Sequence, residues 1–86
     1  MSAEVGSGQM KIRAHRIFTT TIPMPGLTPG NNVVASLTEI DVNGNPFIAD
    51  ATMKIYNVAP GNGDIQVRGE VDWDEDLDIR ISVIFQ

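Results

Sequence analysis

The most constraining feature of this chain is the alternation of apolar and polar residues along its last third. Apolar side chains or glycine occupy every second position in residues 65–73, and apolar side chains do so again in residues 77–85, with three acidic residues between the two runs. Alternate residues of a β-strand point to opposite faces of a sheet, so this period is typical of strands with one buried and one solvated face. We therefore predict a β-hairpin over residues 65–85, in which Trp73 pairs with Leu77.

The register of that hairpin makes further predictions. Glu70 falls opposite Arg80, an opposite-charge pair of a kind that stabilises a sheet by about 0.2–1 kcal/mol. Asp72 falls opposite Asp78, which is unfavourable unless something neutralises one of the charges. Gly69, in the middle of its strand, is expected to mark a bend or the close approach of a neighbouring chain segment.

Three further segments have strand-like patterns. They are residues 11–21, 32–42 and 47–58. Residues 22–32 contain three prolines and two glycines, which argue against a helix or a central strand and predict a stiff surface loop. All five expected strands are therefore separated by segments rich in turn-forming residues.

Local irregularities interrupt two of these segments. Arg16 breaks the alternation of the first, which predicts an edge position or a bulge. Ile40 is out of phase with the preceding apolar residues, which predicts a bulge near residues 38–39. Asn43 and Gly44 then form the strongest short turn signal in the chain, because both residue types tolerate a positive φ.

Taken together, these segments predict an all-β fold. We expect a small antiparallel β-sandwich, immunoglobulin-like or jelly-roll-like, with about five to seven strands and the C-terminal hairpin over residues 65–85. Residues 1–10 are expected to form a flexible N-terminal tail and residues 11–86 a single domain. Residues 41–55 resemble the strand-turn-strand of bacterial immunoglobulin-like adhesin modules, which implies a sandwich but no particular function.

Composition narrows the classes of function. The chain has 86 residues and no cysteine, so it has neither a disulfide nor a thiolate metal site to support a small core. Small domains of this kind gain stability by burying surface against copies of themselves, which predicts a homo-oligomer. The net charge of −5 comes entirely from residues 44–86, and the only basic cluster lies in residues 11–16, so nucleic-acid binding is not expected. No apolar run is long enough to span a bilayer.

The acidic turn is the main chemical cluster in the sequence. Asp72, Asp74, Asp76 and Asp78 lie at every second position, and the first three of them are candidate oxygen ligands for Ca²⁺, the only cofactor that the sequence suggests. The alternative interpretation is a solvated, charged turn that protects the sheet against edge-to-edge association. A patch that recognises a partner is a third interpretation.

Trp73 lies within this cluster. An indole flanked by carboxylates is a plausible platform for a sugar ring, with the four aspartates as the hydrogen-bonding groups of a glycan site. Alternatively, Trp73 continues the inward series of Ile65, Val67 and Val71, and caps the core.

Catalysis is not expected. His15 is the only histidine in the chain, so a His-His metal site is excluded and a Ser-His-Asp arrangement has a single candidate. The carboxylates of the acidic turn are expected to be exposed, and exposed carboxylates keep ordinary pKa values.

Several apolar residues fall on outward positions or in the loop. On the outward face, Ile17, Val34, Tyr56 and Ile84 present more apolar area than a solitary domain usually leaves exposed, so we predict that they form a subunit interface. Met24 and Leu27, in the proline-rich loop, either join this interface or pack as a strap over an open end of the core.

The leading hypothesis is therefore a non-enzymatic interaction or structural subunit that self-associates, with a protein partner also considered. The alternative is a small ligand-binding module, for a glycan or Ca²⁺, centred on Trp73 and the acidic turn.

Overall fold

A computed structural model describes residues 5–86 and confirms the all-β prediction. These residues form six strands and no helix. The strands are β1 (Gly6–Ala14), β2 (Arg16–Pro23), β3 (Val33–Glu39), β4 (Thr52–Pro60), β5 (Asp64–Asp72) and β6 (Leu77–Phe85). They make two three-stranded antiparallel sheets, in the orders β1-β6-β3 and β2-β5-β4. In the described part of the chain, no helix is long and apolar enough to cross a membrane.

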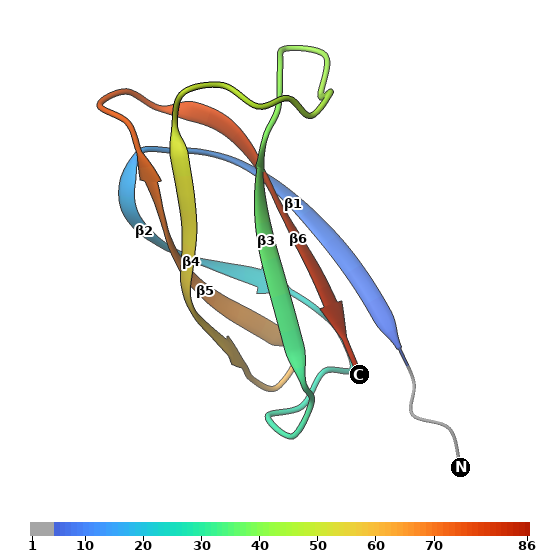
Figure 1. Cartoon of the computed structure of the whole chain (residues 1–86). Helices are drawn as coiled ribbons and strands as arrows, with labels where there is room; N and C mark the ends of the chain where they lie inside the picture. Colours follow the sequence, from blue (N-terminus) through green and yellow to red (C-terminus); the bar gives the residue numbers. More distant parts are fainter. Residues whose placement is uncertain (1–4) are drawn as a thin grey trace.

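The chain crosses from one sheet to the other at every connection except the one between β4 and β5, which pair within the same sheet. The pairs β1–β2, β3–β4 and β5–β6, which we call ribbons, each contribute one strand to each sheet. Short bends join β1 to β2 and β5 to β6, whereas the long loop of residues 40–51 joins β3 to β4 (Figure 1). The ribbon β5–β6 is central in both sheets, and the other two ribbons flank it. The result is an elongated molecule that measures 44 × 23 × 16 Å along its principal axes.

The predicted hairpin over residues 65–85 is wrong, although both of its strands exist. β5 pairs with β2 and β4, whereas β6 pairs with β1 and β3. The acidic turn carries the chain across the core into the other sheet. Alternation of apolar residues shows only that one face of each strand is buried, and this holds whether two strands lie side by side or face each other across a core.

The predicted cross-strand pairs of that hairpin are therefore absent. Glu70 lies opposite Ile17 and Lys54 on the outer face of the sheet β2-β5-β4. Arg80 lies opposite Lys11 and Thr38 in the other sheet.

The first predicted strand, residues 11–21, is in fact two strands. The chain breaks at His15, and Arg16 has a φ of 58°, a left-handed conformation that few non-glycine residues adopt. The break in alternation at Arg16 therefore marks the bend of a ribbon, which carries the chain from one sheet to the other.

Part of the segment predicted as a flexible tail, residues 1–10, forms a strand. Residues 6–10, which we assigned to the tail, form the first half of β1, and residues 1–4 lie outside the described residues. Two glycines in this strand allow neighbouring side chains to pack closely against its backbone. A Cβ at Gly6 would collide with the ring of Phe85, and one at Gly8 would lie 2.6 Å from Met24 Cε.

The second and third predicted strands differ from the structure at the loop that joins them. β3 keeps a continuous register with β6 up to Glu39, so the bulge expected near residues 38–39 is absent. Residues 40–51 form a long loop, in which Ile40 is buried and makes an isolated bridge to Pro46. The register shift of this ribbon lies later, between Ile55 and Asn57 of β4.

The core lies between the two sheets. Its fully buried side chains all come from the two central strands, and they are Ile65, Val67, Val71, Ile79, Ile81 and Val83. Leu27, in the proline-rich loop, is only 3% exposed and packs into the same cluster, with Met24 partly buried beside it. These two residues occupy the position of the expected strap, and Leu27 presents almost no surface to a partner.

Candidate interaction site

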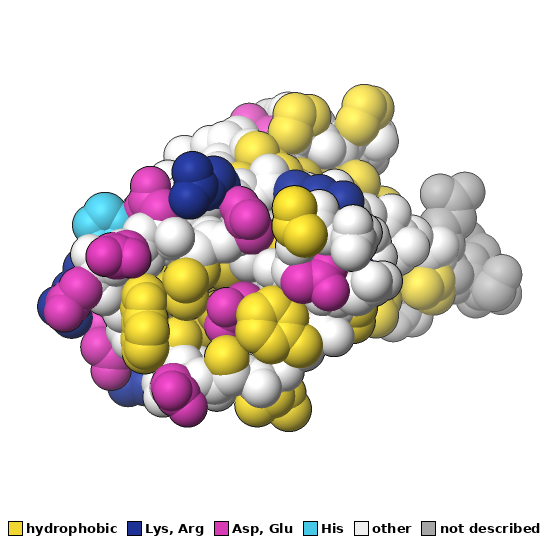
Figure 2. Space-filling model, turned by 90° about the horizontal axis from the view of Figure 1, so that it is seen from above, with side chains coloured by type: hydrophobic (Ala, Val, Ile, Leu, Met, Phe, Trp, Pro, Cys, Tyr) yellow, Lys and Arg dark blue, Asp and Glu magenta, His cyan; other side chains and the backbone are white. Residues whose placement is uncertain are grey.

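The bends and the longest loop gather at one end of the molecule. The turn after β5, the break between β1 and β2, and the loop of residues 40–51 lie toward the upper end in Figure 1. Figure 2 looks down on this end and shows acidic side chains interspersed with apolar ones. We therefore consider this end as the candidate site, beginning with its charged groups.

Basic residues at the first bend accompany the acidic turn. The Arg16 guanidinium pairs with Asp74, and its Nη1 lies 3.5 Å from Asp72 Oδ1. His15 Nδ1 lies 2.5 Å from Asp76 Oδ1. The ribbons β1–β2 and β6–β5 run antiparallel, so their two bends meet and bring these opposite charges together.

The predicted calcium ligands form ion pairs with basic side chains in the structure. Asp72, Asp74 and Asp76 each face a basic side chain, and Asp78 accepts the fourth pair, with Arg13 Nε at 3.2 Å. Within residues 5–86, no group of three or more His, Cys, Asp or Glu side chains is arranged to hold a metal ion. One feature of the sequence is consistent with these pairs. The only basic cluster, in residues 11–16, and the acidic turn each lie at a bend of the chain.

Trp73 does not continue the inward-facing series of Ile65, Val67 and Val71, as its spacing predicted that it could. β5 ends at Asp72, the Trp73 amide donates a hydrogen bond to the Val71 carbonyl at 2.8 Å, and the side chain is 39% exposed. A hollow of about 530 Å³ beside it is lined by Arg16 and the acidic residues of the turn. A second, smaller hollow of about 110 Å³ also borders Trp73, near Leu77 and residues 49–51.

The loop that follows β3 exposes large apolar side chains that we had assigned to a strand. Ile48 is fully exposed and Phe47 is 43% exposed. Both line a hollow of about 300 Å³ at the start of β4, which we call the loop groove. Its other lining residues are Leu37, Thr38, Glu39, Ala49, Ala51 and Met53. Glu39, Ala49 and Ala51 also border the small hollow at Trp73, so the indole adjoins the loop groove.

One signal could have located this loop. Phe47 and Ile48 directly follow Pro46, which has no backbone N–H for a sheet hydrogen bond and is typical of loops and strand ends. The alternation of apolar and polar residues that is typical of a strand begins only at Ala51, one residue before β4.

The four predicted interface residues at outward positions are exposed but do not form one surface. Val34 and Ile84 are direct neighbours on the outer face of the sheet β1-β6-β3, where Val5 lines the same shallow hollow. Ile17 and Tyr56 lie on the outer face of the other sheet, on either side of Glu70. These two pairs therefore belong to opposite faces of the molecule.

Tyr56 is fixed by its acidic neighbour. Its hydroxyl donates a hydrogen bond to the Glu70 carboxylate. This bond, desolvation and the negative charges of Glu70 and Asp72 all favour the neutral phenol, so the pKa of Tyr56 is raised above its ordinary value.

Comparison with known proteins adds no relative: no protein-family model, no curated protein and no solved structure matches the chain.

Proposed function

We propose that this protein is a non-enzymatic interaction or structural subunit that self-associates through the loop groove. The proposal rests on one observation above all, the exposure of Ile48 and Phe47 beside a hollow lined largely by apolar side chains. Large apolar side chains clustered on the surface of a small domain are typical of interaction sites. The enclosure of one core by two sheets also supports classing the fold as a small β-sandwich.

A second copy of the chain suits this surface, because a projecting side chain and a hollow lie next to each other. In a two-fold symmetric dimer, the same patch contacts itself, so Ile48 of each copy can enter the loop groove of the other. Phe47, with Trp73 at the adjoining hollow, supplies aromatic area of the kind that dominates binding energy in interfaces.

Sedimentation velocity over a range of concentrations tests the proposal. We expect the wild-type chain to associate, and Ile48→Asp to shift it to monomer, because the substitution places a charge in the buried centre of the interface. Val42→Asp is the matched control, since Val42 is 93% exposed in the same loop but does not line the loop groove. A monomeric wild-type chain, or equal disruption by both variants, would contradict the proposal.

Ile84→Asp tests the other exposed apolar surface in the same experiment. If this variant dissociates the protein while Ile48→Asp does not, self-association uses the Val34–Ile84 surface that the sequence analysis selected. The subunit role would then stand, but its interface would lie on the outer face of the sheet β1-β6-β3.

A ligand-binding module remains the second candidate function, supported by the hollow of about 530 Å³ between Trp73 and the acidic turn. Trp73 is the only tryptophan, so its fluorescence reports directly on this hollow. Titration with oligosaccharides and with Ca²⁺ tests the candidate. A saturable change in emission that is lost in Asp74→Asn supports it, whereas unchanged emission with these ligands would contradict it.

A further inference from the structure

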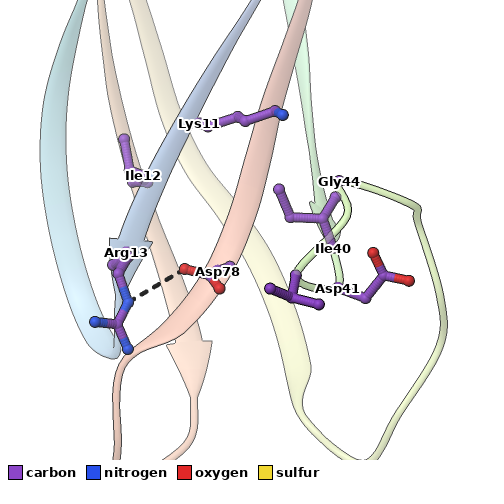
Figure 3. A pocket seen from close by; sticks show the side chains of 8 residues that line it. Lys11, Ile12, Arg13, Ile40, Asp41, Gly44 and Asp78 are labelled. Carbon is purple, nitrogen blue, oxygen red and sulfur yellow. Dashed lines mark ion pairs between the residues drawn. The ribbon is translucent and has the colours of Figure 1, made fainter.

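A second polar surface lies on the outer face of the sheet β1-β6-β3, next to the hollow drawn in Figure 3. The register of this sheet places Lys11 of β1 directly opposite Arg80 of β6, with Thr38 of β3 on the other side. Like charges that face each other across an antiparallel pair are unfavourable unless an anion neutralises them. The following row of the same face carries the polar side chains of Gln9, Ser82 and Ser36.

The two carboxylates that line this hollow, Asp41 and Asp78, are engaged elsewhere. Asp78 pairs with Arg13 in the adjacent row, at 3.2 Å. Asp41 Oδ1 accepts hydrogen bonds from the backbone amides of Asn43 and Asn45, at 2.9 Å each. Among residues 5–86, no ion pair involves Lys11 or Arg80.

Arg80 also holds a donor with no partner. Its Nε is buried and makes no hydrogen bond to any of the described residues. Because this atom has almost no accessible surface, an oxyanion would reach the guanidinium through its terminal N–H groups, which lie in one plane and suit oxyanions.

Space for an acceptor adjoins Lys11, whereas Arg80 does not line it. A hollow of about 380 Å³ is lined by Lys11, Arg13 and Asp78 from the sheet and by part of the loop after β3. In Figure 3, the Lys11 side chain extends across β6 toward Gly44 of this loop. A Cβ at Gly44 would lie 3.0 Å from Lys11 Nζ, so the glycine leaves room for the ammonium group at the rim of the hollow.

We propose that Lys11 and Arg80 bind a phosphate-like oxyanion at the rim of this hollow, on the outer face of the sheet. The anion accepts hydrogen bonds from the Lys11 ammonium and the Arg80 guanidinium, and so removes the repulsion between them. The ligand is a phosphate group, either as the free ion or as a monoester on a larger molecule. The site is separate from the loop groove and does not rest on self-association.

Thermal unfolding and NMR titration with inorganic phosphate test this site, with sodium chloride at equal ionic strength as the reference. We expect phosphate to raise Tm and to shift the amide signals around Lys11 and Arg80 in a saturable way. In Lys11→Gln, binding should be about tenfold weaker, the loss expected for one charge-assisted hydrogen bond. Arg80→Gln should weaken binding likewise, and the exposed Lys11 provides a test even where the Arg80 variant fails to fold.

Lys54→Gln is the matched control, because it removes one positive charge from the outer face of the other sheet. It should bind phosphate as the wild-type chain does. Without phosphate and at low salt, Lys11→Gln should raise Tm because it relieves repulsion from Arg80, whereas Lys54→Gln should lower Tm because Lys54 lies opposite Glu70.

Two outcomes would overturn the proposal. One is a response to phosphate no greater than the response to chloride at equal ionic strength. The other is an equal loss of binding in Lys11→Gln and Lys54→Gln, which would show general screening of charge. Tighter binding of phenyl phosphate than of inorganic phosphate would support the site and assign it to a monoester on a larger ligand.

Discussion

At the scale of single residues, the hydrogen bond from Tyr56 to Glu70 makes a prediction about alkaline pH. Tyr56 is the only tyrosine, so absorbance titration follows its phenol, and we expect a midpoint above the ordinary value near 10. The folded pKa lies above the unfolded one, so the stabilisation is complete below about pH 10 and is lost as pH rises through the folded pKa. Glu70→Gln should lower the midpoint, and an unchanged midpoint would contradict the contact.

Gly69 makes a second prediction at this scale. A Cβ at this buried position would lie 2.9 Å from the Lys54 carbonyl oxygen and 3.0 Å from Phe18 Cζ. The neighbouring strand and the phenyl ring therefore occupy the space that a side chain would need, which is the close approach that the sequence suggested. We expect Gly69→Ala to lower the free energy of unfolding by about 1–3 kcal/mol in urea denaturation.

Gly30→Ala provides the matched control for that measurement. The nearest atom to a Cβ at Gly30 is Thr28 Oγ1 at 3.7 Å, an ordinary contact. This variant should stay within about 0.5 kcal/mol of the wild-type chain. Equal effects of the two substitutions would show that Gly69 is not tightly enclosed.

At the scale of elements, the central finding is that β5 and β6 are consecutive in sequence but belong to different sheets. Their apolar faces meet across the core, and their edges pair with strands distant in the sequence. Double-mutant cycles distinguish this arrangement from a hairpin. Arg13 and Asp78 should couple by about 0.2–1 kcal/mol, because they face each other across β1 and β6.

Glu70 and Arg80 should show no coupling in the same experiment. A hairpin would place them opposite each other, whereas the structure places them on the outer faces of different sheets. Coupling between Glu70 and Arg80, without coupling between Arg13 and Asp78, would contradict the topology.

At the scale of the whole molecule, self-association through an apolar surface predicts a characteristic response to salt. Each copy carries a net charge of −5, and Glu39 and Asp50 border the hollows at the proposed interface. Salt screens this repulsion, and the Debye length falls to about 8 Å at physiological ionic strength. We therefore expect the association constant from sedimentation to rise severalfold between low salt and about 0.15 M salt. Dissociation by salt would indicate an interface held by opposite charges instead.

The candidate site was only partly predictable from sequence. Asp74 and Trp73 stood out because a turn separates two strongly patterned strands, and turns are exposed. The pairing of Asp74 with Arg16 was not foreseen, because 58 residues separate them and only the antiparallel course of two bent ribbons brings them together. Ile48 was missed because its segment was taken for part of a strand.

The sequence by itself determined the all-β class, the inward residues of the two central strands and the position of the acidic turn. A period of two reports which side of a strand faces the core, and this information is local to each strand. The tertiary structure alone decided which strands pair. Backbone hydrogen bonds at a strand edge involve the same groups at nearly every residue, so neighbouring strands are selected by the bends and by packing across the core. The same bends bring the basic and acidic runs together and leave the loop groove exposed.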